Sequence, residues 1–423
     1  MALWPQLRVP RIALLLVTIA VCLIRARDQP SVDVGVGGTT ASVVPGDVLL
    51  VALAVVSLRE LARRGMPRDA RPALFAAAGF CALVLVTAAT NGATALVSGG
   101  KLVELAALAL GAAVLLRRRV EFEAVVDVLL LFTIAADIVG VVKFVESAGG
   151  RQASFLGEHD FAALATLPLL YGLALLYEGG RPARAWLAIA AGALGCILGA
   201  ALASLLGFYL GVAALVALGL LARRLTLAQL AATAGVVAVV TTGTLVIRAG
   251  DLGFLQSWFG KPAERPGQYA SSWSQRLIFA YVGGRIFIDH PIIGTGWYGN
   301  LPPHEFSEYL PDARRRFPDQ PPRYFPSPTK PFIPQQTYDE VLYELGIAGG
   351  VLLLALLVSL GRLAISAGRA TRALVGTLPA AWLAAAVGAI AGEGLFGGTA
   401  LAATFWIACG VVVALALQAK ESA

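Results

Sequence analysis

Charged residues are the scarcest class of residue in this chain. Only 14% of its 423 residues are Asp, Glu, Lys or Arg, whereas a soluble domain carries about 25%. Hydrophobic residues make up 58%, and they gather in runs of about 16 to 22 residues, which is the length of a bilayer-spanning helix. The residues outside these runs are too few to build a soluble core. We therefore expect a single polytopic membrane domain over residues 1–423.

Histidine and cysteine are also rare, which limits the chemistry open to the protein. Each of the four Cys residues lies in an apolar run, and none is spaced as a metal pair or a redox motif. We interpret all four as small buried hydrophobic residues. The sequence HEFSEY at 304–309 lacks the second His of a zinc-protease motif, and GTGWYGN is not a phosphate-binding loop. We therefore expect no metal ion, no cofactor and no nucleic-acid partner.

About twelve apolar runs are long enough to be membrane spans. They lie near residues 11–24, 43–58, 73–90, 101–116, 124–144, 160–177, 185–203, 205–221, 228–247, 340–361, 374–391 and 396–418. The first run lacks a small-residue cleavage site before Arg25, so we interpret it as a span and not as a signal peptide. The least certain boundary separates the seventh and eighth runs, where only Ser204 and Gly207 indicate a turn.

The basic residues of the short loops alternate from one side to the other. One set of loops holds about 18 Lys and Arg residues, which is typical of the cytoplasmic side. The opposite short loops hold only Arg25, Arg27, Lys101, Lys143 and Arg151. This pattern predicts an even number of spans with both termini in the cytoplasm.

The segment from 249 to 337 is then a long extracytoplasmic loop between the ninth and tenth spans. It is rich in aromatic residues and proline, so we expect it to be structured. Residues Ser274 to Asp289 have the apolar spacing of an amphipathic helix at the membrane surface. The proline-rich part from Leu301 to Pro334 is predicted to be an irregular loop, and GTGWYGN to be a turn whose glycines allow positive φ.

The outer side of this topology carries all three histidines and a group of arginines. These residues are His159, His290 and His304, together with Arg276, Arg285, Arg314, Arg315, Arg316 and Arg323. Arginine forms bidentate hydrogen bonds with phosphate oxygens, so the group suits a lipid diphosphate. A basic loop that lies on anionic lipid headgroups is the alternative interpretation.

Four charged residues lie in or near the apolar runs: Glu104, Asp127, Asp137 and Lys143. Such residues usually face the interior of a helix bundle or a cavity. Lys101 and Glu104 are three residues apart, a spacing that allows a pair on one helix. For Asp137, structural pairing and a functional role both stay open.

Three motifs between Ser274 and Gly350 carry a family resemblance: SWSQRLIFA, DHPIIGTGWYGN and QQTYDEVLYELGIAGG. Together they resemble the O-antigen ligase and O-antigen polymerase superfamily, and GEHDFA at 157–162 is similar to the start of an earlier span in that family. The resemblance implies transfer of a glycan from an undecaprenyl diphosphate carrier to an acceptor glycan or glycolipid. It places the reaction at the outer face of the bacterial cytoplasmic (inner) membrane, without metal or nucleotide.

The chain departs from the family pattern at two places. Gln335 and Gln336 stand where the family has His-Asn, and an amide cannot act as a general base. Ser204-Leu205-Leu206 stands where the family has Ser-Arg-Gly, so one phosphate-binding arginine is missing. Arg276 matches the second such arginine.

We therefore expect a lipid-linked glycosyltransferase, either a ligase or a polymerase. Arg276 would hold the donor diphosphate, assisted by Arg285 or by Arg314, Arg315 and Arg316. Gln335 would only orient the acceptor. Either the reaction has little need of a base, or the base is another residue, for which His304, His159, Asp160 and Asp339 are the candidates. The alternative is a non-enzymatic lipid-glycan transporter or a scaffold of an export complex, which explains the departures but not why Arg276 and the His290 turn are present.

Overall fold

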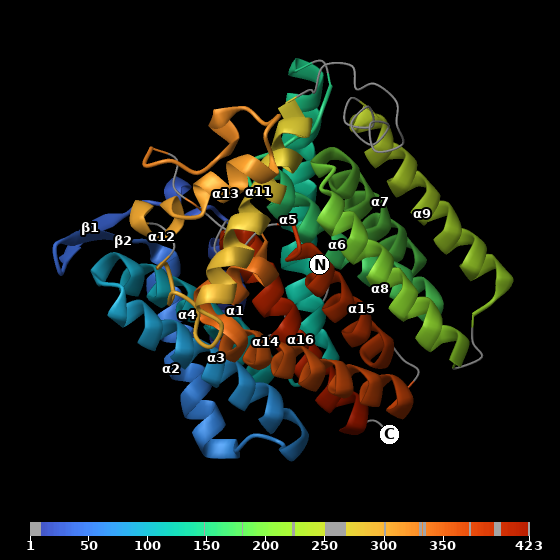
Figure 1. Ribbon diagram of the computed structural model, residues 1–423. Coiled ribbons are helices and arrows are strands. Elements are labelled where there is room, and N and C mark those ends of the chain that lie inside the picture. The colour runs from blue at the N-terminus through green and yellow to red at the C-terminus, as the bar shows by residue number, and fades with distance from the viewer. Residues whose placement is uncertain are drawn as a thin grey trace.

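The structure is a bundle of long helices, with a lobe of shorter elements at one end (Figure 1). The computed structural model describes residues 10–147, 149–179, 181–221, 225–249, 268–299, 302–329, 332, 336–371, 374–392 and 399–421. The long helices are α1 (Pro10–Cys22), α2 (Pro45–Arg64), α3 (Arg71–Thr90), α4 (Ala93–Leu115), α5 (Arg119–Glu146), α6 (Glu158–Glu178), α7 (Pro182–Gly199), α8 (Leu202–Leu221), α9 (Leu227–Ile247), α14 (Thr337–Ala370), α15 (Leu374–Ala389) and α16 (Thr399–Glu421).

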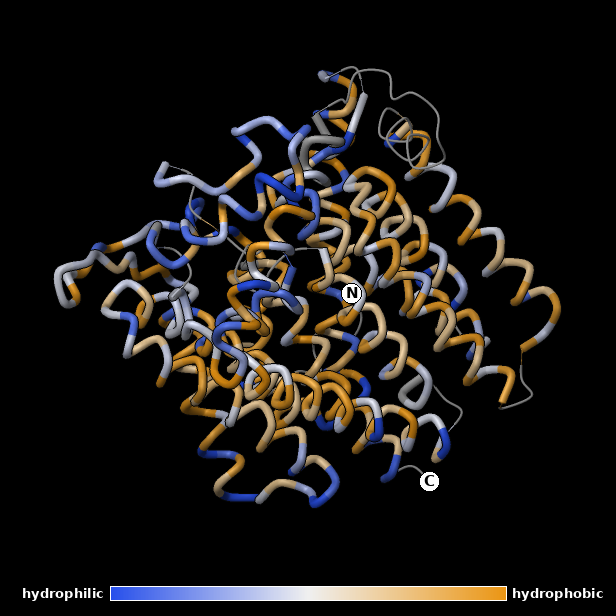
Figure 2. Tube along the Cα trace, in the orientation of Figure 1, coloured by the Kyte–Doolittle hydropathy of each residue, from blue (hydrophilic) through white to orange (hydrophobic). Residues whose placement is uncertain are grey.

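Each predicted span coincides with one of these helices. Nine helices in the described part of the chain are long and apolar enough to cross a membrane, and α1 and the described turns of α15 are shorter apolar helices. Figure 2 shows hydrophobic residues along the bundle and hydrophilic residues in the lobe and the connecting loops. The prediction of an all-α membrane protein is thus confirmed, while the number of twelve spans stays a prediction.

The boundary between the seventh and eighth spans is real, but it lies earlier than predicted. α7 ends at Gly199, and Ala200 has a left-handed backbone with φ 44°. Ser204 and Gly207 lie inside α8 and do not form the turn. A Cβ atom on Gly207 would lie 2.4 Å from the carbonyl oxygen of Ala385 in α15, so this glycine permits close helix packing.

Four elements of the lobe come from the long predicted loop: α11 (Gln268–Asp289), α12 (Pro303–Ser307), α13 (Leu310–Arg316) and the 3-10 turn η4 (Pro322–Tyr324). α11 confirms the predicted helix, although the prediction of an irregular loop from Leu301 to Pro334 is wrong for the residues that form α12, α13 and η4. Their apolar side chains explain the difference, because they pack on α11 in a small second core. That core includes Ile278, Phe279, Val282, Ile286, Phe306, Tyr309, Ala313 and Phe325.

A β-hairpin that we did not predict precedes α2. β1 (Val32–Val36) pairs antiparallel with β2 (Thr39–Val43), and Gly37 and Gly38 at the turn both have positive φ. The hairpin extends from the flank of the bundle beside α4 (Figure 1).

The two glycine motifs of the predicted family pattern interlock. Helix α14 is broken at Gly346, whose φ of 60° and ψ of −158° are not helical. The amide nitrogens of Ile347 and Ala348 donate to the carbonyls of Pro291 (2.8 Å) and Ile292 (3.0 Å). Gly294 has φ +65° and packs against the backbone of residue 344, which confirms the predicted turn. The turn therefore supplies hydrogen-bond acceptors for the broken helix.

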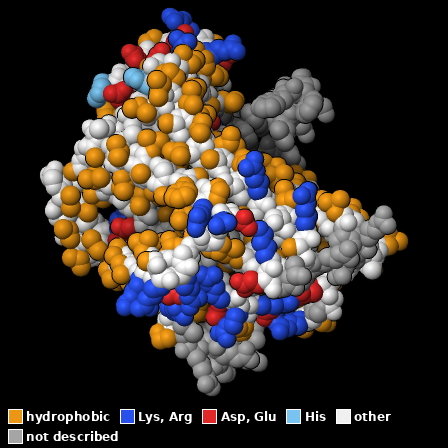
Figure 3. Space-filling model, turned by 90° about the horizontal axis from the view of Figure 1, so that it is seen from below, with side chains coloured by type: hydrophobic (Ala, Val, Ile, Leu, Met, Phe, Trp, Pro, Cys, Tyr) orange, Lys and Arg blue, Asp and Glu red, His pale blue; other side chains and the backbone are white. Residues whose placement is uncertain are grey.

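Ion pairs connect several helix ends at the end of the bundle opposite the lobe. At the end opposite the lobe, Arg11 pairs with Glu60 at 2.9 Å and Lys420 pairs with Asp69. These pairs join the start of α1 to the end of α2, and the end of α16 to the loop before α3. Figure 3 shows Lys and Arg side chains gathered on this end with acidic side chains among them.

Candidate functional site

Helix α6 begins at the lobe end of the bundle, and its first turn carries His159 and Asp160. Asp160 is buried, and its Oδ1 atom accepts a hydrogen bond of 2.6 Å from the backbone amide of Leu401 in α16. A Cβ atom on Gly157 would lie 2.4 Å from Arg25 Nη2 and 2.6 Å from Asp160 Oδ2. Arg25 also donates to the carbonyl of Leu156. Asp160 is thus held between Arg25 and the start of α16.

Two further arginines are anchored on the C-terminal end of α7. Arg151 donates to the carbonyl of Gly199 at 3.3 Å and pairs with Glu158 at 2.8 Å. Arg248 donates to the carbonyl of Ala200 at 2.9 Å. Both side chains are largely buried. The exposed carbonyls at a helix C-terminus attract cations, which explains this placement.

Arg276 approaches the same place from α11. Its Nη1 atom donates to the carbonyl of Gly392 at 2.9 Å, just after α15. A Cβ atom on Gly392 would lie 3.4 Å from His159 Nδ1, and the charges of Arg151, Arg248 and Arg276 all act on the His159 ring. We call Arg25, Arg151, Arg248 and Arg276 the guanidinium cluster.

His159 is a buried titratable group on which Arg151, Arg248 and Arg276 all act electrostatically. Its Nδ1 atom is buried and has no hydrogen-bond partner among the residues that the structure describes. The described contacts therefore do not fix which ring nitrogen carries the hydrogen, and the neutral ring keeps one nitrogen that accepts a proton.

The structure does not bring Arg285 to this cluster. Arg285 follows Arg276 by nine residues on α11, so at 100° per residue the two side chains leave opposite faces of the helix. Arg285 is exposed and acts electrostatically on Asp312 of α13. Hydrogen bonds from Tyr281 and Arg315 hold the pKa of Asp312 below its usual value.

The other predicted residues of the lobe are also directed elsewhere. Arg314 lies over the ring of Phe325 at 5.8 Å, and Arg315 pairs with Asp312 at 3.0 Å. His304 has a side chain that is 77% exposed and lies 3.1 Å from Glu305. We therefore find no described contact that connects them to Arg276.

The last two predicted residues are Gln335 and Asp339. Gln335 lies outside the described residues. Asp339 is half-buried and hydrogen-bonds with the side chain of Tyr343. The first turn of α14 is attached to the end of α15, because Thr337 N donates to the carbonyl of Ile390 at 3.2 Å. Asp339 and Arg276 thus both belong to elements that contact the end of α15.

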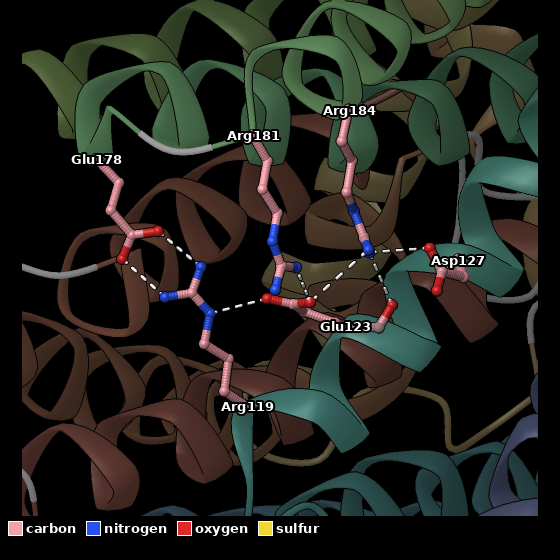
Figure 4. Close-up of polar contacts among 6 residues, drawn as sticks. All are labelled: Arg119, Glu123, Asp127, Glu178, Arg181 and Arg184. Carbon is pink, nitrogen blue, oxygen red and sulfur yellow. Dashed lines mark hydrogen bonds and ion pairs between the residues drawn. The ribbon is translucent and has the colours of Figure 1, made fainter. Parts of the chain in front are cut away.

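A second cluster of charges lies at the opposite end of the bundle (Figure 4). Glu123 of α5 is buried and pairs with Arg119 (2.8 Å), Arg181 (2.5 Å) and Arg184 (3.7 Å). Arg119 also pairs with Glu178 at 2.6 Å, and Arg184 pairs with Asp127 at 2.8 Å. Every carboxylate in Figure 4 has a guanidinium partner. We therefore interpret this network as structural, because its ion pairs hold α5, α6 and α7 together.

The remaining charges predicted within spans have mixed surroundings. Lys101 forms an ion pair with Asp47 of α2, and no ion pair between Lys101 and Glu104 is found among the described residues. Lys143 donates to the carbonyl of Ser154 at 2.7 Å. Asp137 is buried, and its Oδ1 atom has no hydrogen-bond partner within the described ranges.

Residues 185–354 match the family described as O-antigen ligase. The chain carries an O-antigen ligase domain. No curated protein sequence matches the chain significantly. The O-antigen ligase match runs from α7 into α14 and includes Arg248, Arg276 and both interlocked glycine motifs. It confirms the family resemblance and supports a lipid-linked glycan ligase or polymerase in general.

The candidate site also contains residues from outside the matched O-antigen ligase segment. Arg25, Arg151 and His159 precede it, and Gly392 follows it. Three of the four clustered arginines, Arg25, Arg151 and Arg248, were not predicted as site residues. The positive charge around His159 and Asp160 thus comes from the segments that follow α1, α5 and α9 and from the middle of α11.

Proposed function

We propose that the protein transfers a glycan from a polyprenyl-diphosphate carrier to an acceptor glycan or glycolipid, at the outer face of the bacterial cytoplasmic membrane. The observation that carries the proposal is the guanidinium cluster around His159 at one end of a membrane bundle. Guanidinium groups in a partly buried site bind and neutralise a diphosphate strongly. An O-antigen ligase domain supports the same class of reaction.

In the proposed reaction the acceptor hydroxyl oxygen bonds to the anomeric carbon of the donor glycan. The bond between that carbon and the diphosphate oxygen breaks, and the diphosphate leaves as an anion held by Arg276, Arg248 and Arg151. The hydroxyl proton passes to His159. The proposal needs no metal ion and no cofactor, because the guanidinium groups balance the charge of the leaving group.

Contacts favour His159 over the other predicted bases. His304 is 77% exposed and its described neighbour is Glu305. Asp160 already accepts the amide of Leu401, so its role is to hold the start of α16. Asp339 is the second choice, because it is half-buried at the first turn of α14, next to the end of α15. Arg285, Arg314 and Arg315 are assigned to the lobe and not to the diphosphate.

The test uses the protein in liposomes with a polyprenyl-diphosphate-linked glycan and an acceptor glycolipid. Transfer by the unmodified protein is expected, and His159→Gln should abolish transfer while binding of the donor lipid persists. Arg314→Ala is the control for removal of an exposed arginine from the lobe and should leave transfer unchanged. If the unmodified protein moves or binds the donor lipid but never transfers its glycan, the transporter or scaffold alternative replaces the enzyme.

A further inference from the structure

A cavity of about 520 Å³ lies among α2, α3, α4, α14 and α16, away from the guanidinium cluster. Val51 and Leu58 of α2 both line it, and each is 54% exposed on the surface of the bundle. Along a membrane helix such apolar side chains face lipid. The cavity is therefore a cleft that opens sideways to the hydrocarbon core.

The shape of the cleft suits one extended hydrocarbon chain. On α4 its lining runs from Gly100 to Ala113, and 13 residues of helix rise about 20 Å. Most of the α4 residues between these limits that line it are alanine or other apolar residues, such as Ala106 and Ala107. Small side chains on one helix leave a slot parallel to the helix axis.

Two polar atoms of the cleft lack partners. Glu104 Oε2 and Trp406 Nε1 are buried, line the cleft, and have no hydrogen bond to any described residue. The carboxyl group of Glu104 as a whole does have a neighbour, because it hydrogen-bonds with the side chain of Asp47. A buried polar atom without a partner costs free energy. Both lie toward the lobe end of the cleft, since Trp406 is the first residue of α16 in its lining and Glu104 lies close to Gly100. The cleft thus has a polar upper part above an apolar slot.

We propose that this cleft binds one fatty-acyl chain of a membrane lipid that is amide-linked or carries a hydroxyl group near its carbonyl. The indole N–H of Trp406 would donate to the acyl carbonyl, and Glu104 would accept from the amide or hydroxyl group. A polyprenyl chain offers neither group. The site is independent of the proposed glycan transfer.

Photo-crosslinking in liposomes tests the proposal with three probes that carry the same diazirine. The first has an amide-linked hydroxyacyl chain, the second a simple ester-linked phospholipid chain, and the third is a polyprenyl phosphate. The labelled residues are mapped by mass spectrometry. The first probe should label α3 and α4 several-fold more than the second, and the third should give only background labelling there. Equal labelling by all three probes, or strongest labelling by the polyprenyl probe, would overturn the proposal.

Two variants test separately whether binding depends on the shape of the cleft and on its polar group. Ala107→Trp should fill the slot and reduce labelling by the first probe to background, whereas Val239→Trp on the exposed face of α9 should not. Glu104→Met keeps the length of the side chain and removes one hydrogen bond. It should lower labelling by the first probe about two- to twelvefold and leave the ester-linked probe unchanged. An unchanged ratio of the two probes in folded Glu104→Met would refute the role of the carboxyl group.

Discussion

Arg276 offers the sharpest test of the guanidinium cluster, because α11 carries its own control. Arg276 lies on the face of α11 that contacts Gly392, whereas Arg285 leaves the opposite face and is exposed. Arg276→Ala removes a planar group that can hold two phosphate oxygens at once. Arg285→Ala removes the same group from the same helix outside the cluster.

The expected effect follows from the number of hydrogen bonds lost. A hydrogen bond with a charged group contributes about 1.5–3 kcal/mol, so a bidentate contact with the leaving diphosphate contributes about 3–6 kcal/mol. That range corresponds to a decrease in kcat/KM of about 10²- to 10⁴-fold. Arg276→Lys keeps a donor for the carbonyl of Gly392 but loses the fork, so it should recover little of the rate.

The assay measures glycan transfer in liposomes, with the amount of folded protein quantified for each variant. Arg285→Ala should stay within about twofold of the unmodified protein, since removal of an exposed charge typically changes interactions by less than 1 kcal/mol. Full transfer by Arg276→Ala, or an equal loss in both variants, would refute the assignment of the diphosphate site.

Four further predictions follow from single residues. Reporter fusions near Pro318 should read external and fusions after Arg64 cytoplasmic; a cytoplasmic signal at Pro318 would reverse the proposed sidedness. Gln335→Ala should lower transfer only by the loss of one hydrogen bond, about 0.5–1.5 kcal/mol, whereas a loss of 10²–10⁴-fold would make Gln335 part of the proton path. Gly346→Ala should destabilise the protein by at least about 1–3 kcal/mol, because its φ of 60° is strained for alanine and a Cβ atom would meet the Ile292 carbonyl at 2.5 Å; an unchanged melting temperature in detergent would contradict this. Glu123→Ala should destabilise by about 1–3 kcal/mol, because Arg181 loses its described carboxylate partner while Arg119 keeps Glu178 and Arg184 keeps Asp127, and donor binding measured on the folded fraction should not change.

The helices and their order could be predicted from the sequence because lipid imposes one strong rule. Every backbone polar group within the bilayer must be satisfied inside its own segment, so the spans appear as apolar runs of nearly constant length. Features that depend on tertiary contacts could not be predicted from this rule. Gly207 resembled a turn residue although it packs on α15, and α12 and α13 depend on a small core with α11 that no local pattern reveals.

The candidate site was only partly predictable, for a physical reason. Arg276, His159 and Asp160 were found through motifs, and the structure places all three at the corner formed by α6, α11, α15 and α16. His304, Arg285 and Arg314 belong to the same predicted outer side, but they are separated from that corner by helix phase and by contacts within the lobe. The side of the membrane on which a residue lies can be inferred from the charges of the loops. The face of a helix from which a side chain points, and what that face contacts, is known only from the packed structure.

Arg25 and Arg151 show which sequence signal was overlooked. Both were counted only as exceptions to the charge bias, since they are arginines in short loops of the predicted outer side. The bias arises because positive charge is disfavoured in short loops on the outer side. An arginine in such a loop is therefore expected to have a local interaction that favours it. In the structure each has one: Arg25 stands beside Asp160, and Arg151 is held by Glu158 and the end of α7. We propose that Arg151 and Arg248 offset the arginine missing from the Ser204-Leu205-Leu206 position, because their side chains bring positive charge to the loop between α7 and α8. A departure from a family motif therefore does not by itself remove a function when neighbouring helix ends can deliver the same group to the same place.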